Sequence, residues 1–254
     1  MEKIFPLSGK PIVVIGPMAC EIEYIASKLS EPREISFGGY QFRSGTVDGY
    51  PVVAARSLIG MVNSAVTTAL AIREFDPAMV IIQGTAGGHD PARHKNDIIL
   101  GEHMVEIGNW YSPHRDAGRG TRIEDWFTPG EEIMTEDGIR RFTVLKSHEE
   151  LLRAAEEVPY AKGKLVRGTI GSADLWDKEI DRILYLHRVT GSDAEEMEGF
   201  AVAQVCMEFH VPVLHIRVVS NSELYPEEVF SEDSGVFCQE YVYNVIRNMI
   251  AKKS

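Results

Sequence analysis

The sequence predicts one α/β domain with a mixed, mostly parallel twisted sheet flanked by helices. Short β-branched runs alternate with stretches of helical apolar spacing along the chain, and this alternation is typical of parallel strands joined by helices. The length of 254 residues suits one large domain or two small ones. No Pro/Ser-rich linker or internal repeat divides the chain, so we expect residues 1–254 to form a single domain.

The first half of the chain alternates strand and helix signals. The β-branched run Pro11–Ile15 predicts a strand that ends at Gly16–Pro17, and the apolar spacing over residues 19–29 predicts a helix after it. The dipeptide Asp48–Gly49 between two alternating runs predicts a hairpin turn. The elements expected here are strands at 11–15, 40–47, 52–56, 79–83 and 97–100, and helices at 19–29 and 61–75.

The second half begins with a polar stretch, residues 109–129, rich in Gly, Trp and Arg. It predicts a long loop, and loops of this length are often functional. Phe200–Phe209 is almost uncharged, which is typical of a buried helix, and Val211–Ser220 is typical of a buried strand. The elements expected here are helices at 136–157, 200–209 and 235–252, and strands at 164–172 and 211–220.

The composition narrows the function classes. A formal net charge of −12 argues against a nucleic-acid groove as the main function, although a local cationic site for a small anion is not excluded. The three cysteines, Cys20, Cys206 and Cys238, lie in apolar contexts and indicate reduced core residues of a cytoplasmic protein. No apolar run reaches the about 18 residues of a membrane span, and residues 1–6 lack a signal-peptide pattern.

In open α/β sheets, ligands bind beyond the carboxyl ends of the strands. The predicted strand ends contain carboxylates, hydroxyls, glycines and an amide but no Cys/His cluster at metal-ligand spacing, so we predict no metal. They also lack the phosphate-loop and dinucleotide fingerprints, and we expect no cofactor. Acids and hydroxyls suggest sugar-hydroxyl binding and water activation. The segments are 16–21, 84–88, 172–176, 196–198 and 220–223.

The segment Glu195–Glu198 places three carboxylates around Met197, directly before the buried helix. Buried carboxylates are costly unless they bind something. A helix N-terminus stabilises an acid by roughly 0.3–1 kcal/mol, which accounts for one of the three more easily than for all. We interpret Glu195 and Glu196 as capping or solvated acids. Arg217, in an apolar strand, needs an acidic partner.

Taken together, these residues resemble the nucleoside phosphorylase/nucleosidase superfamily, and in particular the 5′-methylthioadenosine/S-adenosylhomocysteine nucleosidases. The resemblance runs from Ile12 to Ala251 and is weakest between Asn109 and Lys162. It implies a three-layer nucleoside phosphorylase-like fold and a role in methionine salvage. No single matching segment is specific for the family, but the segments together, in this order and at this spacing, are specific. The segments are Gly16–Ile22, Phe37–Gly39, Gly84–Gly88, Val166–Gly168, Glu196–Glu198 and Arg217–Asn221.

The resemblance assigns a role to each matching position. Glu21 matches the acid that activates the attacking water, and Glu198 matches the acid that binds the ribose 2′- and 3′-hydroxyls. Met197 would pack under the ribose and purine, Trp176 against the base, and Phe230 against the 5′-substituent. The implied catalytic residues are Glu21, Arg217 and Asn221, and the implied substrate-binding residues are Thr85, Gly87, Trp176, Met197, Glu198, Ser220 and Phe230.

One position departs from the family pattern. Where the nucleosidases carry an aspartate that protonates the leaving purine, this chain has Asn221, and an amide donates hydrogen bonds but no full proton. Three interpretations stay open: Asn221 binds N7 of a purine that leaves less easily, the base is a 6-oxopurine, or the enzyme is impaired. Asp177 also differs, because the nucleosidases usually carry an aliphatic residue there.

Hydrolysis is favoured over phosphorolysis. The similar hexameric phosphorylases place arginines where this chain has Glu21 and Gln83, and an acid would repel phosphate. The predicted function is therefore a purine nucleosidase that uses water to cleave 5′-modified nucleosides, with a homodimer implied by resemblance. The alternatives are a 6-oxopurine (inosine- or futalosine-like) nucleosidase, a purine nucleoside phosphorylase and a non-catalytic nucleoside-binding protein.

Overall fold

A computed structural model of the chain describes residues 5 and 7–252. The prediction about a signal peptide concerns residues 1–6, which lie outside the described residues except for residue 5. The strands are β1 (Ile12–Gly16), β2 (Ser30–Phe37), β3 (Tyr40–Val47), β4 (Tyr50–Arg56), β5 (Met79–Gly88), β6 (Ile98–Glu106), β7 (Glu131–Thr135), β8 (Gly138–Phe142), β9 (Leu145–Lys146), β10 (Leu165–Ser172), β11 (Ser192–Glu196) and β12 (Val213–Asn221). The helices are α1 (Glu23–Ser27), α2 (Met61–Phe75), α3 (Glu149–Glu156), α4 (Ile180–Thr190), α5 (Gly199–Glu208) and α6 (Glu232–Ala251), with short 3₁₀ turns at Ala19–Glu21 and Ile123–Asp125.

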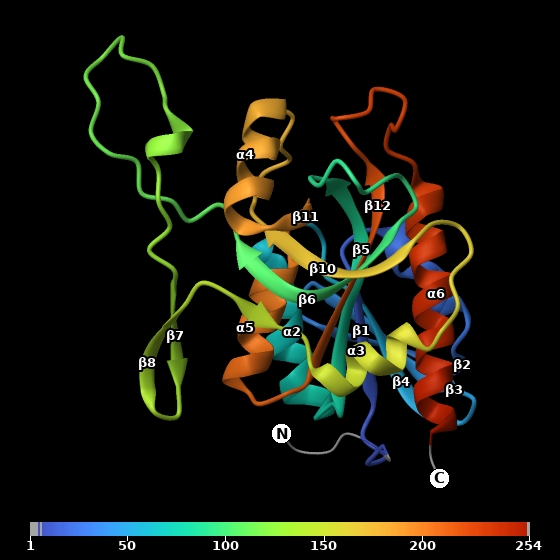
Figure 1. The fold of residues 1–254 in the computed structure, drawn as a ribbon. Helices are drawn as coiled ribbons and strands as arrows, with labels where there is room; N and C mark the ends of the chain where they lie inside the picture. Colours follow the sequence, from blue (N-terminus) through green and yellow to red (C-terminus); the bar gives the residue numbers. More distant parts are fainter. Residues whose placement is uncertain (1–4, 6, 253–254) are drawn as a thin grey trace.

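Ten strands form one central mixed sheet flanked by helices, as the sequence predicts (Figure 1). Its order is β11-β10-β6-β12-β5-β1-β4-β3-β2, β9 pairs with β6, and β11 also pairs with β5. Parallel pairings join β1 to β4 and β5, and β12 to β5. The carboxyl ends of β1, β5 and β12 therefore meet at one edge of the sheet, where ligands of α/β proteins usually bind.

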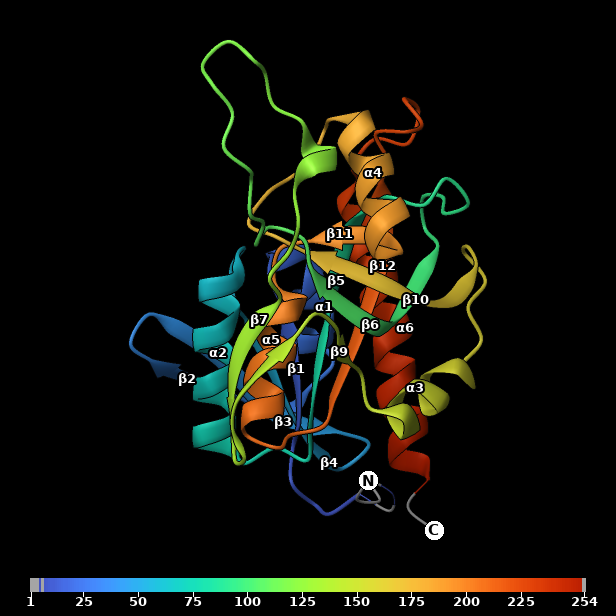
Figure 2. The ribbon, with the colours of Figure 1, turned by 60° about the vertical axis from the view of Figure 1, so that its left-hand side comes forward.

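Both faces of the sheet are covered by helices, because the central strands are apolar on both sides. In β1, Ile12 and Val14 belong to the apolar cluster that contains residues of α1, α3 and α6. Val13 and Ile15 belong to the cluster formed with α2 and α5. This alternation is the period of two that a strand imposes on its side chains. Figure 2 shows the two helical layers on either side of the strands.

The observed elements differ from the predicted ones in several places. The helix predicted at 19–29 is a 3₁₀ turn at Ala19–Glu21 followed by the short helix α1 at Glu23–Ser27. The predicted helix at 136–157 is wrong over most of its length, because 138–142 is a strand and only Glu149–Glu156 is α-helical. The glycine turn 84–88 continues β5 as a strand. Strands β2, β7 and β11 and helix α4 had no predicted counterpart. The hairpin turn at Asp48–Gly49 is confirmed, with φ of 47° and 76°.

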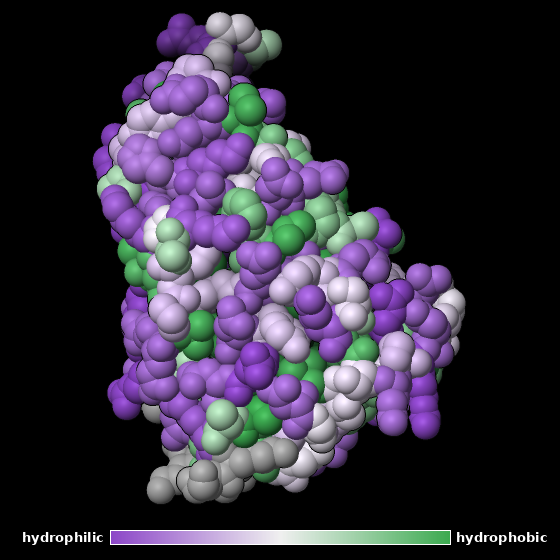
Figure 3. Space-filling model, turned by 90° about the vertical axis from the view of Figure 1, so that its right-hand side faces the viewer, coloured by the Kyte–Doolittle hydropathy of each residue, from purple (hydrophilic) through white to green (hydrophobic). Residues whose placement is uncertain are grey.

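The surface on the α6 side is mostly hydrophilic, with hydrophobic side chains scattered over it (Figure 3). Among the described residues, no helix combines the length and the apolar character that crossing a membrane requires.

Ile246 on α6 offers a test of how the sheet face is packed. Its side chain is fully buried in the cluster between α6 and the sheet. We expect Ile246→Ala to lower the free energy of unfolding by about 2–5 kcal/mol, because the lost contacts and the remaining cavity both destabilise the fold. Urea denaturation measures this change. The control Val189→Ala, half-exposed on α4, should stay within about 0.5 kcal/mol of the parent. Equal effects in the two variants would contradict the packing described here.

Candidate functional site

A cavity of about 220 Å³ lies at the carboxyl edge of the sheet. All ten residues predicted from the sequence line it: Glu21, Thr85, Gly87, Trp176, Met197, Glu198, Arg217, Ser220, Asn221 and Phe230. Seven further residues line it without having been predicted as site residues: Pro17, Met18, Ile59, Ala86, Leu175, Glu195 and Glu196. The structure thus brings residues from distant parts of the chain to one cavity.

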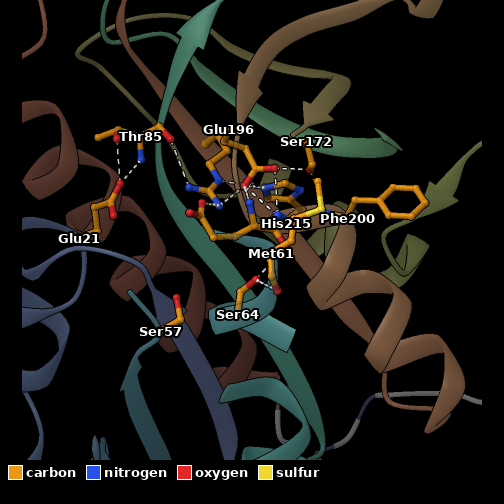
Figure 4. Close-up of polar contacts among 12 residues, drawn as sticks. Glu21, Ser57, Met61, Ser64, Thr85, Ser172, Glu196, Phe200 and His215 are labelled. Atoms are coloured by element: carbon orange, nitrogen blue, oxygen red, sulfur yellow. Dashed lines mark hydrogen bonds and ion pairs between the residues drawn. The ribbon is translucent and has the colours of Figure 1, made fainter. Parts of the chain in front are cut away.

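Glu21 is buried at the end of the 3₁₀ turn that follows β1. Its Oε1 accepts hydrogen bonds from the backbone N–H of Thr85 at 2.7 Å and from the Thr85 hydroxyl at 2.8 Å, and its Oε2 accepts from the N–H of Met18 at 2.7 Å. Figure 4 shows Glu21 and Thr85 together, on one side of a larger polar cluster. Three donors therefore hold the carboxylate of Glu21 in one orientation.

Arg217 lies at the centre of that larger cluster and is almost completely buried. Its Nη2 donates to Glu196 and, at 3.1 Å, to Glu198, while its Nη1 donates to the Thr85 carbonyl at 3.2 Å. The acidic partner expected for Arg217 is therefore a pair of carboxylates. Since a buried guanidinium without partners would be strongly destabilising, this pairing is a condition of the fold.

Glu196 lines the cavity, but its carboxylate is occupied by hydrogen bonds within the polar cluster. It accepts the N–H groups of Glu198 and Gly199 at the start of α5 and the hydroxyl of Ser172. Burial would raise the pKa of Glu196, but the charge of Arg217 and these hydrogen bonds hold it below the ordinary glutamate value. The capping interpretation of Glu196 is confirmed by these contacts.

Glu198 has a different environment. Its Oε1 accepts the N–H of Gly60 at 2.9 Å, in the loop before α2, and its Oε2 contacts Arg217. Burial raises the pKa of Glu198 above the ordinary value; Arg217 opposes the shift and the nearby charge of Glu196 adds to it. The pKa values of the two acids that contact Arg217 are therefore shifted in opposite directions, which is typical of functional sites.

His215 lies beneath this cluster and accepts a hydrogen bond at Nε2 from Arg217 Nε at 3.0 Å. Burial lowers the pKa of His215 to about 3, and Arg217 contributes in the same direction against the opposing charge of Glu196. The neutral ring also requires Gly199 next to it: a Cβ at Gly199 would lie 2.0 Å from the ring Cε1. His215 is thus a buried support of Arg217 and not a pocket residue.

Glu195 adds a polar group to the cavity wall, although its position in the sequence did not indicate a site residue. Glu195 is 5% exposed, so it is not a solvated acid, and it accepts the N–H of Asp177 at 2.8 Å. Its Oε2 lies 3.2 Å from Nε2 of buried His89, without the alignment of a hydrogen bond. Asn221 is close by, with its Oδ1 accepting the hydroxyl of Ser220 at 2.8 Å. The capping or solvated interpretation of Glu195 is wrong.

The remaining walls are apolar. Trp176 and Phe230 stand at the mouth with ring centroids 6.2 Å apart, and both are partly exposed. Ile59, Leu175 and Met197 complete this side. Aromatic and thioether side chains are suited to stack on a flat ring and to pack against an apolar substituent.

The charges of the cavity limit the chemistry that it supports. Arg217 is the one arginine or lysine that lines it within the described chain, and its guanidinium is already paired with Glu196 and Glu198. No group of three or more His, Cys, Asp or Glu side chains suited to a metal is found among the residues that the structure describes. The arrangement fits a neutral, hydroxyl-bearing ligand better than an anion.

Comparisons of the sequence with a family model and with known proteins indicate the same family. The model of the phosphorylase superfamily matches residues 11–247. The 5′-methylthioadenosine/S-adenosylhomocysteine nucleosidase of Lysinibacillus sphaericus is 32% identical, over 83% of this chain and 85% of its own. The enzyme of the same name from Psychromonas ingrahamii is 28% identical, over 92% and 99%.

Solved structures agree with this result. The 5′-methylthioadenosine/S-adenosylhomocysteine nucleosidase of Neisseria meningitidis, in complex with methylthio-immucillin-A, superimposes with a TM-score of 0.77 at 25% identity, covering 94% of this chain and 99% of the other. The futalosine hydrolase of Helicobacter pylori gives a TM-score of 0.75 at 26% identity, covering 94% and 97%.

The buried, neutral His215 leads to a prediction about stability and pH. Because its pKa is lower in the folded than in the unfolded chain, it contributes stability above pH 6.5 and loses it as the pH falls toward 3. This one group should lower the free energy of unfolding with a slope of up to about 1.4 kcal/mol per pH unit below pH 6. Denaturant titrations at pH 7, 6 and 5 should therefore show a shallower decline for His215→Gln than for the parent. Parallel curves would mean that the histidine is not held neutral.

Proposed function

The chain belongs to the phosphorylase superfamily, and from this membership and the chemistry of its cavity we propose that it is a purine nucleosidase. It would hydrolyse the N-glycosidic bond of 5′-modified nucleosides, as the names of its relatives indicate for them. The single observation that carries the proposal is one cavity that contains both Glu21 and Glu198, each held in place by hydrogen bonds.

In this proposal Glu21 acts as the general base. Its carboxylate, oriented by Thr85 and Met18, would take a proton from a water molecule as that water attacks C1′ of the ribose. The pair of electrons of the C1′–N9 bond leaves with the purine. The ribose becomes oxocarbenium-like in the transition state, and the negative carboxylates near it stabilise that positive charge.

In this proposal Glu198 binds the sugar. Its carboxylate, positioned by Gly60 and Arg217, would accept hydrogen bonds from the 2′- and 3′-hydroxyls. Met197 would pack under the ribose and purine. Trp176 would cover the base, and Phe230 and Ile59 would line the space for an apolar 5′-group such as a thioether. The leaving base would meet Asn221, which donates hydrogen bonds to ring acceptors.

Water is favoured over phosphate as the nucleophile. A phosphate site needs cations that are free to bind it, whereas Arg217 is already paired with Glu196 and Glu198. The buried carboxylate of Glu21, close to the attacking position, would repel an anion. Product formation should therefore not require phosphate, and a strict requirement for phosphate would identify a phosphorylase instead.

We further infer one domain, a cytoplasmic location, a place in methionine salvage and a homodimer. Support for the dimer comes from exposed apolar residues next to the cavity: Leu58, Ile59, Val62 and Val66 are between 37% and 73% exposed, and Ile59 also lines the cavity. Apolar patches of this kind often mark interfaces. Light scattering should give twice the mass of the chain.

Glu21→Gln tests the base. The amide keeps the shape of Glu21 but cannot accept the proton, so we expect kcat to fall by about 10²–10⁴-fold with little change in KM. The matched control is Glu23→Gln, a half-exposed carboxylate two residues on, which should leave both constants unchanged. Release of purine from 5′-methylthioadenosine and 5′-methylthioinosine, followed by chromatography, measures the rates. Full activity of Glu21→Gln would remove the proposed base from the mechanism.

A further inference from the structure

Two buried glutamine side chains, one from the sheet and one from α6, hold the turn that carries Glu21. Gln83 on β5 donates through Nε2 to the backbone carbonyl of Glu21. Gln239 on α6 donates through Nε2 to the carbonyl of Cys20 at 2.6 Å, and its Oε1 accepts the N–H of Ile25 at 3.2 Å. Both glutamines are almost completely buried. Two consecutive carbonyls of the turn are thus hydrogen-bonded to side chains of other elements.

Gln83 reaches Glu21 because of its place on β5. Ile81 of the same strand packs in the apolar cluster that contains residues of α6, and side chains two residues apart on a strand point to the same face. Gln83 and Thr85 therefore both point to the face on which the turn lies. The missing side chain of Gly16 makes room for the contact, since a Cβ there would lie 2.5 Å from the Glu21 carbonyl oxygen and 2.9 Å from Gln83 Nε2.

The hydrogen bonds of Glu21 differ in what they fix. The N–H of Met18, which donates to the Glu21 carboxylate, belongs to the same turn and cannot hold that turn against the sheet. Thr85 on β5 donates to the carboxylate, at the end of a side chain with several rotatable bonds. Gln83 is the residue of the sheet whose side chain fixes the main chain of Glu21. The carboxylate and the main chain are thus tied to the same strand at separate points.

Packing alone does not account for Gln83. Its Oε1 has no hydrogen-bond partner among the described residues, although buried polar atoms are usually paired and an unpaired one is destabilising. Gln83 is also not one of the residues that line the cavity. The one hydrogen bond that its side chain makes within the described chain is the one to Glu21. The contribution of the amide must therefore pass through Glu21.

We propose that Gln83 is a positioning residue of the reaction, which holds the main chain of Glu21 so that its carboxylate points at the attacking water. The inference rests on the proposed function, in which Glu21 is the general base. Gln83 acts through Glu21 and not on the ligand itself. A misplacement of about 1 Å in a reacting group can lower a rate about 100-fold, so a contact outside the cavity can still determine turnover.

Gln83→Met tests this contact, since methionine has a similar length and no donor. The substrate is 5′-methylthioadenosine or 5′-methylthioinosine, whichever the parent cleaves faster. We expect kcat to fall about 10–100-fold and KM to stay within about twofold, because the residues proposed to bind the substrate keep their contacts. The matched control is Gln41→Met, at an exposed glutamine of β3, which should change neither constant. A higher KM with an unchanged kcat would contradict the inference.

The same substitution in the Glu21→Gln background separates positioning from a general loss of structure. If Gln83 acts through Glu21, Gln83→Met should lower the remaining rate by less than about twofold once the base is gone, so the two effects should not be additive. A substitution that merely weakens the fold would lower the rate by the same factor in both backgrounds. That result would overturn the inference and leave the nucleosidase proposal intact.

Amide hydrogen exchange measures the turn without any need for turnover. Peptides that cover residues 18–22 should exchange about tenfold faster in Gln83→Met than in the parent, whereas peptides from β12 should not change. Gln239→Met releases the Cys20 carbonyl from the α6 side, and as a second variant it should also speed exchange in this turn. Faster exchange in a protein that cleaves no nucleoside would support the positioning contact and refute only the proposed hydrolysis. Unchanged exchange at 18–22 in both variants would overturn the inference, whatever the activity.

Discussion

The buried ion pairs of Arg217 are the interaction on which the rest of the site depends. A guanidinium at the centre of an apolar sheet is tolerated only with full charge compensation and hydrogen bonding, and Glu196 and Glu198 supply the charge. Glu196 in turn accepts the first N–H groups of α5, so the same carboxylate holds the arginine and starts the helix. The position of Glu198 in the cavity follows from this, since it is the N-cap residue of that helix.

Arg217 also connects the two acids that carry the proposed reaction, Glu21 and Glu198. Its Nη1 donates to the carbonyl of Thr85, and the N–H and hydroxyl of Thr85 donate to Glu21. The acid proposed to activate water and the acid proposed to bind ribose are therefore joined through one residue of β5, although 177 positions separate them in the sequence (198 − 21). A change at Thr85 or Arg217 would disturb both, and effects of mutations at these residues should not be additive.

The sequence predicted the position of the site because strand ends in an α/β fold can be located from apolar runs and glycines, as at Gly16 and Asn221. It failed where the outcome depends on pairing between distant strands. Glu195 and Glu196 are neighbours and look alike in the sequence, yet the strand alternation of β11 sends one to the arginine and the other to the far end of the cavity. Residues 136–157 were expected to form one helix, but Gly138–Phe142 pairs with Glu131–Thr135 in the β7–β8 hairpin, and this pairing between two segments cannot be read from the sequence of either one alone.

Glycines explain why this polar network can be so dense. A Cβ at Gly84 would lie 2.7 Å from both Arg217 Nη1 and Glu21 Oε1. A Cβ at Gly199 would collide with the ring of His215. Gly87 is different, because a Cβ there would meet its neighbours at ordinary van der Waals distance. Packing therefore does not require glycine at 87, and its lack of a side chain matters for the space it leaves between Glu195 and Asn221. The first two glycines allow the side chains of the site to approach one another, whereas the third leaves room for a ligand.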